Sequence, residues 1–213
     1  MKATRDAFGE QLKVSARNND QIIGLSADLG KATKIDTFGK EYPERLLETG
    51  IAENNMIGIA SGLSEYGYKV FLASFASFLT GKYDTIRCSI AYSNVPCVIV
   101  GTHCGMAIGK DGVTQMGLED ISLMRSLPGI TILNPSTYNQ TRSVVKFLCE
   151  NELSNPYYLR LGRQPVSEVY NVNDSFKIGN GHLHRVGDLG VVFSSGCVLG
   201  DVLDATEGLD ITI

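Results

Sequence analysis

The sequence predicts an α/β fold: a doubly wound, mostly parallel sheet with helices on both faces. Two observations predict it. Short apolar runs rich in Val and Ile alternate with segments of helical pattern, and several of these runs end in a polar residue. Strands of a parallel sheet are buried on both faces and joined by crossover helices, so this alternation is what the architecture requires.

The predicted elements follow one another from the amino terminus. Residues 4–18 form the first helix, because apolar side chains recur there at helical spacing. Residues 21–28 form the first strand, a short apolar run that contains Asp28 at its end. Similar runs predict strands at 45–51, 69–75, 96–103, 129–135 and 156–162. The segments between them predict helices at about 52–66, 80–94, 118–127 and 136–151.

The chain changes character after residue 165. Residues 166–187 are polar and rich in turn-forming residues, which predicts a linker after a first domain of residues 1–165. Residues 188–213 restart as strand, glycine-rich turn, helix and strand. A lone β-α-β unit cannot bury both faces of its sheet. We therefore expect residues 188–213 to be the start of a second α/β domain, incomplete or completed by another chain.

Composition narrows the class of protein. The net charge is −4 and no cluster of Lys and Arg stands out, which argues against nucleic acid or an anionic membrane as the main partner. The five cysteines show neither C-x-x-C nor zinc-site spacing, which indicates free thiols in a reducing compartment. The first residues do not resemble a signal peptide, and no apolar run approaches the roughly 20 residues of a membrane span. We expect a cytoplasmic protein.

Residues able to carry chemistry fall at or just after predicted strand ends. They are Asp28, Glu53, Phe75 and His103. Ligands of open α/β sheets bind beyond the carboxyl ends of the strands. The sequence therefore predicts a shared site at this edge of the sheet.

Glu53, within LETGIAENNMIGIASGL at 47–63, has two interpretations. An acid in the first turn of a helix is stabilised by exposed N–H groups and needs no further role. The small apolar residues around it favour the other interpretation, because a carboxylate buried among them needs a partner.

The remaining candidates are equally open from the residues alone. Phe75 and Phe78 are three residues apart. This spacing is compatible with two side chains of the hydrophobic core and also with two rings that stack on a flat heterocycle. His103 is an acid, base or ligand candidate, or simply a buried histidine. Arg160 and Arg163 lie close together at the end of the last predicted strand. They either bind a phosphate or carboxylate group or remain exposed to solvent.

The loop 101–117, GTHCGMAIGKDGVTQMG, has glycines at 101, 105, 109 and 112. Asp111 follows Gly109-Lys110 where a phosphate-binding P-loop needs Ser or Thr, and the G-x-G-x-x-G pattern is absent. The glycines indicate tight turns or a close approach to a ligand, as in a plain surface loop or a binding loop.

Five blocks, in this order, resemble the transketolase family: SADLG, PERLLETGIAENNMIGIASGL, ASFASFLTGKYDTIR, THCGMAIGKDGVTQMGLEDISLMRSLPGITILNP and LRLGRQP. The chain is most similar to the separately encoded C-terminal half of a split transketolase. The resemblance covers about residues 3–165 as the pyrimidine-binding domain and continues through 188–213 as the start of the family's C-terminal domain. The blocks are specific to thiamine-diphosphate enzymes and less specific to transketolase itself.

The resemblance implies cofactor roles. Glu53 matches the glutamate that hydrogen-bonds the ring nitrogen of the aminopyrimidine, so that the cofactor's amine can take the proton from the thiazolium carbon. Phe78 matches the aromatic residue stacked on that ring, and Phe75 matches its neighbour. Asp28 matches an aspartate near the cofactor and the subunit contact.

The resemblance also implies substrate roles. His103, a catalytic candidate with Glu53, and Asp111 match residues that hold hydroxyls of a sugar-phosphate donor. Arg163 matches the arginine that contacts the substrate phosphate, with Arg160 beside it. Gln115 stands where many transketolases have a second histidine. Glutamine hydrogen-bonds a hydroxyl but carries no proton at neutral pH, so the ketose specificity and any proton transfer at this position stay open.

The G-D-G…N motif that holds the diphosphate and magnesium in this family is absent from the sequence. In the family that motif lies on the other domain. The resemblance therefore implies thiamine diphosphate and Mg²⁺ bound together with an N-terminal transketolase subunit, in a dimer or heterotetramer that acts on sugar phosphates.

The expected function is transfer of a two-carbon ketol unit, as in the pentose phosphate reactions. Three alternatives remain open from the sequence. The chain is also compatible with a 1-deoxyxylulose-5-phosphate-synthase-like enzyme, with the β subunit of a 2-oxoacid dehydrogenase, or with a non-catalytic scaffold of the same fold.

Overall fold

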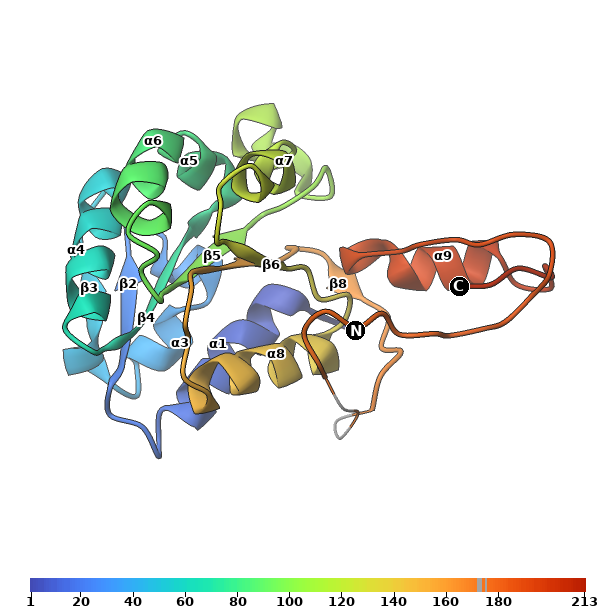
Figure 1. Ribbon diagram of the computed structural model, residues 1–213, viewed down its shortest axis with the longest axis horizontal. Coiled ribbons are helices and arrows are strands. Elements are labelled where there is room, and N and C mark those ends of the chain that lie inside the picture. The colour runs from blue at the N-terminus through green and yellow to red at the C-terminus, as the bar shows by residue number, and fades with distance from the viewer. Residues whose placement is uncertain (172–173, 175) are drawn as a thin grey trace.

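A six-stranded parallel sheet forms the centre of the computed structural model, which describes residues 1–171, 174 and 176–213 (Figure 1). Its order is β3-β2-β4-β5-β7-β6, and every neighbouring pair is parallel. The strands are β2 (Ile22–Ser26), β3 (Leu46–Glu48), β4 (Lys69–Phe75), β5 (Val98–Thr102), β6 (Thr131–Leu133) and β7 (Tyr157–Arg160). The predicted doubly wound α/β fold is confirmed.

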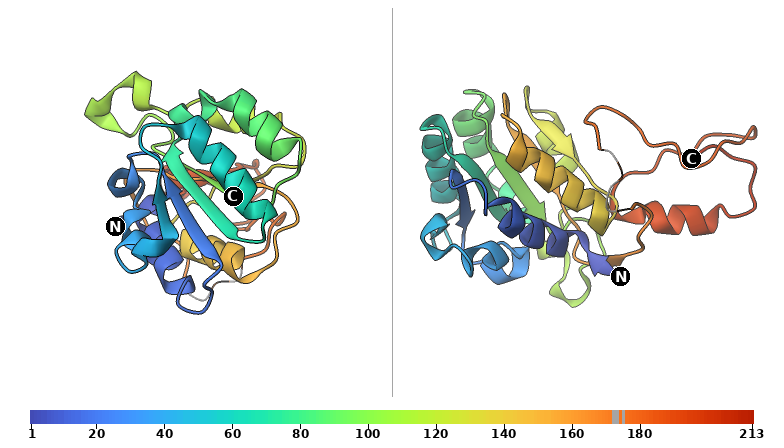
Figure 2. Two further views of the ribbon diagram at one scale, coloured as in Figure 1. Left: turned by 90° about the vertical axis from the view of Figure 1, so that its left-hand side faces the viewer. Right: turned by 90° about the horizontal axis from the view of Figure 1, so that it is seen from below.

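Helices cover both faces of this sheet (Figure 2). One face packs against α1 (Thr4–Ser15), α3 (Asp36–Gly39) and α8 (Tyr138–Glu150). The other packs against α4 (Glu53–Glu65), α5 (Ala76–Thr80), α6 (Tyr83–Ile86) and α7 (Asp120–Arg125). The short α2 (Gly30–Thr33) follows β2.

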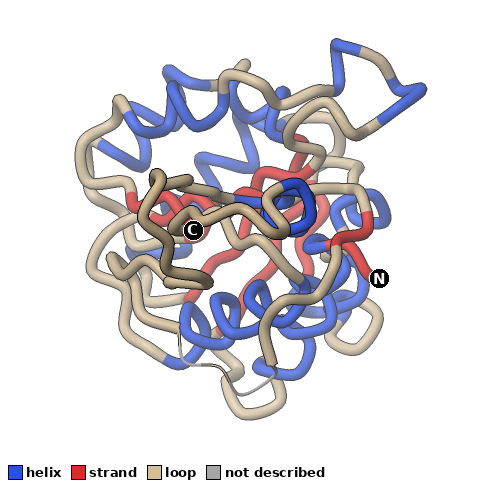
Figure 3. The backbone as a smooth tube through the Cα atoms, turned by 90° about the vertical axis from the view of Figure 1, so that its right-hand side faces the viewer, coloured by secondary structure: helices blue, strands red, loops and turns tan. Residues whose placement is uncertain are grey.

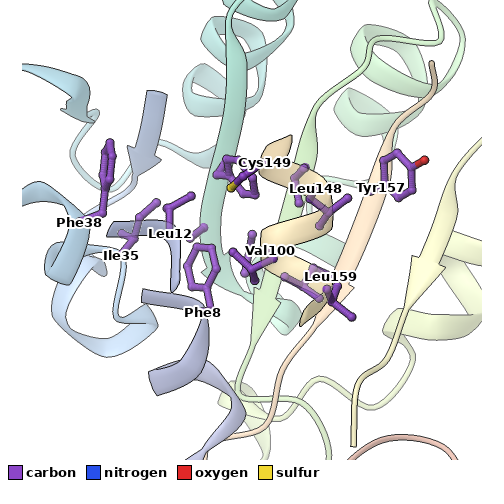
Figure 4. Packing of buried hydrophobic residues seen from close by; sticks show 14 of the residues in the cluster. Phe8, Leu12, Ile35, Phe38, Val100, Leu148, Cys149, Tyr157 and Leu159 are labelled. Atoms are coloured by element: carbon purple, nitrogen blue, oxygen red, sulfur yellow. The ribbon is translucent and has the colours of Figure 1, made fainter. Parts of the chain in front are cut away.

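Two hydrophobic clusters result from the alternation of side chains along each strand. On β4, Phe71 and Ala73 join the cluster under α1 and α8, whereas Val70 and Leu72 join the cluster under α4. Figure 4 shows the first cluster, to which α1, α3 and α8 contribute alongside β5 and β7. Burial on both faces explains why the strands are continuous apolar runs in the sequence.

The predicted helix at 80–94 differs from the structure. Instead of one helix at 80–94, the chain forms α5 directly after β4, then α6, then a π-helix at Arg87–Ala91. The helix α5 ends at Thr80 with Gly81 as its C-cap, and the π-helical turn closes with a bond of 2.8 Å from the N–H of Tyr92 to the carbonyl of Arg87. The predicted helix did not include α5 apart from Thr80, and apolar spacing alone does not distinguish α6 and the π-helix from one long helix.

The C-terminal segment lies to one side of the sheet (Figures 1 and 3). Strand β8 (Pro165–Val166) pairs antiparallel with β1 (Lys2–Ala3), and α9 (Leu199–Ala205) lies farther along the chain. The two strands predicted around this helix are reduced to one parallel bridge between Val191 and Thr212. Leu189 and Phe193 are exposed there, because no further strand lies beside the bridge to bury them among the described residues. The division into 1–165, 166–187 and 188–213 remains a prediction.

Within the part of the chain that the structure describes, no helix is both long enough and apolar enough to span a membrane.

Candidate functional site

Glu53 begins α4, after a connection of four residues from the end of β3. Its side chain is 8% exposed, and its Oε1 accepts a hydrogen bond of 3.5 Å from the hydroxyl of Ser74 on β4. The helix is held against the sheet by Met56, Ile57 and Ala60, which are fully buried. Glu53 thus meets both sequence interpretations, since it lies in the first helical turn and is also buried. A carboxylate with this one long bond retains capacity to accept from a ligand.

Three aromatic rings lie in a row beside Glu53's partner Ser74. Phe75 ends β4 and is stacked on Phe78 of α5, with centroids 5.3 Å apart and planes at 21°. The imidazole of His103 also lies against Phe75, with 3.7 Å between the ring centroids. Phe78 is the outer ring and remains partly exposed, whereas Phe75 and His103 are buried. The accessible ring is the one predicted to stack on a heterocycle.

His103 follows β5 in the left-handed region, with φ of 58°, and is 2% exposed. Its Nε2 lies 3.1 Å from Nη1 of Arg5, and its Nδ1 lies 3.0 Å from Oγ1 of Thr102. A guanidinium only donates, so Nε2 must accept and the ring proton resides on Nδ1. That proton is donated to Thr102, whose hydroxyl in turn donates to the carbonyl of Ser74 at 3.3 Å. The contacts therefore select one tautomer of neutral His103.

The surroundings keep His103 neutral at physiological pH. The pKa of His103 is lowered to about 4, and burial is the largest of the causes. The positive charges of Arg5 and Arg163 also lower it, and Asp111 opposes them. The imidazole is accordingly suited to accept a hydrogen bond and not to act as a cation.

Arg163 and Asp111 form an ion pair between the end of the sheet and the glycine-rich loop. Arg163 also donates to the carbonyl of Ile108 at 2.6 Å, so it contacts the loop at two points. Gln115 is half-buried in the same loop and donates to Thr114 at 3.3 Å. The structure thus joins the predicted substrate residues Asp111 and Arg163 directly.

Arg160 does not join this group. Its Nε donates to Asp120 Oδ2 at 2.9 Å, and Asp120 is 0% exposed. The interpretation that Arg160 and Arg163 together hold an anion is therefore wrong, because Arg160 is already neutralised by a buried carboxylate.

Asp28 lies at the same edge, just after β2, but farther from the aromatic row in sheet order. It is exposed and has a left-handed backbone with φ of 59°. Its N–H donates to Glu48 Oε1 at 2.6 Å, and the same oxygen accepts from Gly50 at 3.1 Å. A cavity of about 560 Å³ lies here and is lined in part by Asp28, Lys31 and Glu48.

Arg5 is a site residue that the sequence prediction missed. The N–H of Gly162 donates to Thr4 Oγ1 at 2.9 Å, and β1 pairs with β8, which together bring the start of α1 to the end of β7. Arg5 then contacts the carbonyl of Ala32 at 2.8 Å and also His103. The residues it contacts are distant in sequence, so no local pattern indicates this position.

Burial lowers the pKa of Arg5, and the nearby charge of Arg163 adds to this effect. Two guanidinium groups with one exposed carboxylate, Asp111, leave a local excess of positive charge. This cluster of Arg5, His103, Asp111 and Arg163 is suited to an anionic group that also carries hydroxyls.

Among the residues that the structure describes, no group of three or more His, Cys, Asp and Glu side chains is arranged to hold a metal ion.

Comparison with known proteins identifies the family to which the chain belongs. Residues 1–168 match the model of the transketolase pyrimidine-binding domain. A protein of Methanocaldococcus jannaschii described as a transketolase C-terminal section is 34% identical over 97% of this chain and 66% of its own length. The 6-deoxy-6-sulfo-D-fructose transketolase subunit SqwH of Clostridium sp. is 33% identical over 96% of this chain and 63% of its own.

The fold comparison agrees. A solved split-gene transketolase, an inactive β4 tetramer, superposes with a TM-score of 0.88 and 36% identity, over 99% of this chain and 70% of the other. This chain spans less than two thirds of the length of the curated relatives just named. By the domain match and by its fold, the chain belongs to the transketolase family through its pyrimidine-binding domain.

Proposed function

We propose that the chain is the pyrimidine-side subunit of a thiamine-diphosphate-dependent transketolase, which transfers a two-carbon ketol unit between sugar phosphates. The observation that carries the proposal is the buried Glu53 carboxylate beside the Phe75–Phe78 stack. Family membership supports the use of thiamine diphosphate. The relatives encoded as separate transketolase sections support a partner subunit.

The residues present fit the pyrimidine ring of this cofactor. A flat nitrogen heterocycle needs an aromatic surface and a hydrogen-bonding group at its edge. Phe78 offers a partly exposed ring, and Glu53 offers a carboxylate with free acceptor capacity. Both lie at the carboxyl edge of the sheet, where α/β folds bind ligands.

Each residue of the site then has a task. Bound thiamine diphosphate supplies a carbon nucleophile that the side chains of proteins lack. Glu53 holds a proton at the ring nitrogen, and the low exposure around it excludes water from that proton. Phe78, supported by Phe75, fixes the plane of the ring.

The substrate side follows from the charged cluster. Neutral His103 accepts a hydrogen bond at Nε2 from a substrate hydroxyl once Arg5 turns to the anionic end of the sugar phosphate. Arg163 binds the same anion, and Asp111 accepts from another hydroxyl. Gln115 hydrogen-bonds the sugar without exchanging a proton. Asp28 contributes near the subunit contact.

A partner subunit completes the site in this proposal. The chain supplies neither the sequence motif for diphosphate and Mg²⁺ nor, among its described residues, a cluster suited to a metal. We infer that an N-terminal transketolase subunit holds both groups, in a heteromer whose two halves enclose the cofactor.

Calorimetry on the complex of this chain with a co-expressed N-terminal subunit tests the cofactor assignment. Thiamine diphosphate with Mg²⁺ is expected to bind saturably to the complex. No binding would support a non-catalytic scaffold instead.

A donor panel then tests the reaction. We expect ketol transfer from ketose phosphates, whereas turnover only of pyruvate with an aldose phosphate would assign a 1-deoxyxylulose-5-phosphate-synthase-like enzyme. Turnover only of 2-oxoacids with an acyl carrier would assign a dehydrogenase β subunit. A 6-deoxy-6-sulfo ketose belongs in the panel, because one relative is named for it and two arginines suit a sulfonate as well as a phosphate.

A further inference from the structure

Asp120 is a fully buried carboxylate that the proposed reaction does not use. It is the first residue of α7 and is 0% exposed. Its Oδ2 accepts from the hydroxyl of Tyr158 at 2.8 Å and from Nε of Arg160 at 2.9 Å, and the thiol of Cys104 lies 3.5 Å away. Its Oδ1 is buried without a hydrogen-bond partner among the described residues. Burying such a group is unfavourable unless its contacts are maintained.

The donors around Asp120 keep their protons. Burial raises the pKa of the Tyr158 hydroxyl and of the Cys104 thiol well above their usual values, and the Asp120 charge adds to both. Tyr158 is thus a neutral donor to Asp120, and Arg160 supplies the one opposite charge. The neutral Cys104 thiol lies between two acceptors, Asp120 Oδ2 at 3.5 Å and the Gly101 carbonyl at 3.3 Å. This group, called here the Asp120 cluster, consists of Asp120, Tyr158, Arg160 and Cys104.

The Asp120 cluster closes the base of the glycine-rich loop. Cys104 and Gly117 form a parallel bridge at the two ends of that loop. The N–H of Gly105 donates to the Gly117 carbonyl at 2.8 Å, and Arg160 approaches the same carbonyl at 3.4 Å. Asp120 therefore contacts both ends of the loop. It contacts the first end directly at Cys104, and it contacts the second end, at Gly117, through Arg160.

His103 is the next residue along the chain from this base. Its carbonyl accepts from the N–H of Gly117 at 3.2 Å, and its left-handed backbone aims the ring at Phe75 and Arg5. We propose that Asp120 is a positioning residue, which holds His103 in its buried place through the base of the loop. Asp120 itself lies outside the predicted contacts with substrate and cofactor.

The test is the titration of His103 in the full-length chain carrying Asp120→Asn, followed by NMR of the histidine rings. The chain has three histidines, so a His103→Gln variant assigns the signal. If Asp120 positions the ring, the imidazole gains water in the variant, and its pKa rises from about 4 toward the ordinary 6.5. Loss of a negative charge alone acts in the opposite direction, because it destabilises the imidazolium. The sign of the change thus separates positioning from simple electrostatics.

Glu119→Gln is the matched control, since it removes the same charge from the neighbouring, exposed residue. We expect it to leave the His103 titration unchanged. If circular dichroism shows that Asp120→Asn does not fold, Tyr158→Phe decides the question. It removes one donor to Asp120 without altering charge, and a rise in the His103 pKa is again expected. A His103 pKa that stays the same or falls in the deciding variant overturns the proposal.

A second readout rests on the proposed function. In the complex with the partner subunit, Asp120→Asn is expected to lower kcat/KM on the order of 10- to 100-fold while thiamine-diphosphate affinity is unchanged. A complex in which even the native chain is inactive would contradict the proposed function and leave the titration result standing. An active variant with native kcat/KM would overturn the positioning role alone.

Discussion

At the scale of single residues, the site depends on two buried polar side chains at the carboxyl edge of the sheet. Glu53 is a carboxylate at a helix N-terminus among apolar side chains, and His103 is an imidazole held neutral between a guanidinium and a threonine hydroxyl. Both are positioned from the backbone of α4 and β5, so small substitutions test them without disturbing the fold.

Replacing Glu53 by Gln in the reconstituted complex is expected to reduce turnover by about 10²- to 10⁴-fold, because the amide cannot hold the proton at the pyrimidine nitrogen. Asn54→Ala, on the adjacent exposed residue, is the control. The measurement is a coupled ketol-transfer assay with saturating cofactor. If the complex carrying Glu53→Gln turns over at the native rate, Glu53 has only a helix-capping role.

The stability of the chain is expected to fall between pH 6.5 and pH 4. Because the folded-state pKa of His103 is about 4 and the ordinary value is 6.5, the unfolded chain binds more protons in this window. The contribution of neutral His103 is fully present above pH 6.5 and is lost as the pH falls toward 4. It amounts to at most about 3 kcal/mol.

Urea unfolding of the native chain and of His103→Gln at pH 7.0 and 4.5 measures this contribution. The pH-dependent loss should be smaller in His103→Gln, and His182→Gln serves as the control. Equal losses in the native chain and His103→Gln would contradict the assignment of a neutral, buried His103.

At the scale of elements, contacts between strand ends and loops build the site. The β1–β8 pair and the Thr4–Gly162 hydrogen bonds bring Arg5 to His103, and the bridge between Cys104 and Gly117 closes the loop that carries Asp111. The central strand β5 allows these approaches because Gly101 leaves space for Tyr158. A Cβ added at Gly101 would lie 2.2 Å from the Tyr158 hydroxyl oxygen.

Gly101→Ala is therefore expected to destabilise the isolated chain by about 1–3 kcal/mol, since Tyr158 has no room to move inside the core. Gly58→Ala is the matched comparison, because a Cβ there meets nothing within 4 Å on α4. Helix propensity predicts that it stabilises the chain by up to about 1 kcal/mol. Chemical unfolding of both variants provides the measurement, and an equal effect of the two substitutions would contradict the packing described for β5.

The elements also show what sequence can and cannot predict. Strand β4 matches its predicted bounds of 69–75, because a strand buried on both faces leaves an unbroken apolar run. The strand-end location of Glu53, Phe75 and His103 followed from the same alternation. Arg5 was missed, and Arg160 was misassigned, because their partners His103 and Asp120 lie far away in the sequence. The elements α6 and Arg87–Ala91 were merged into one helix, since their apolar period is that of a single helix, and α5 was not predicted.

At the scale of the whole molecule, the proposed function assigns half of an active site to one edge of the sheet. Glu53 and Phe78 suit a pyrimidine ring. The cluster of Arg5, His103, Asp111 and Arg163 suits an anionic sugar. The diphosphate and Mg²⁺ are assigned by the proposed function to a partner subunit. The relatives encoded as separate sections and the family domain that matches this chain support that division.

The most direct test of this account is ketol transfer between sugar phosphates by the purified chain, with and without its co-expressed N-terminal subunit. Thiamine diphosphate and Mg²⁺ are present in both reactions. We expect turnover by the complex and none by the chain alone. Equal turnover by the chain alone would contradict the half-site, and a complex that binds the cofactor but transfers no ketol unit would contradict the transketolase assignment.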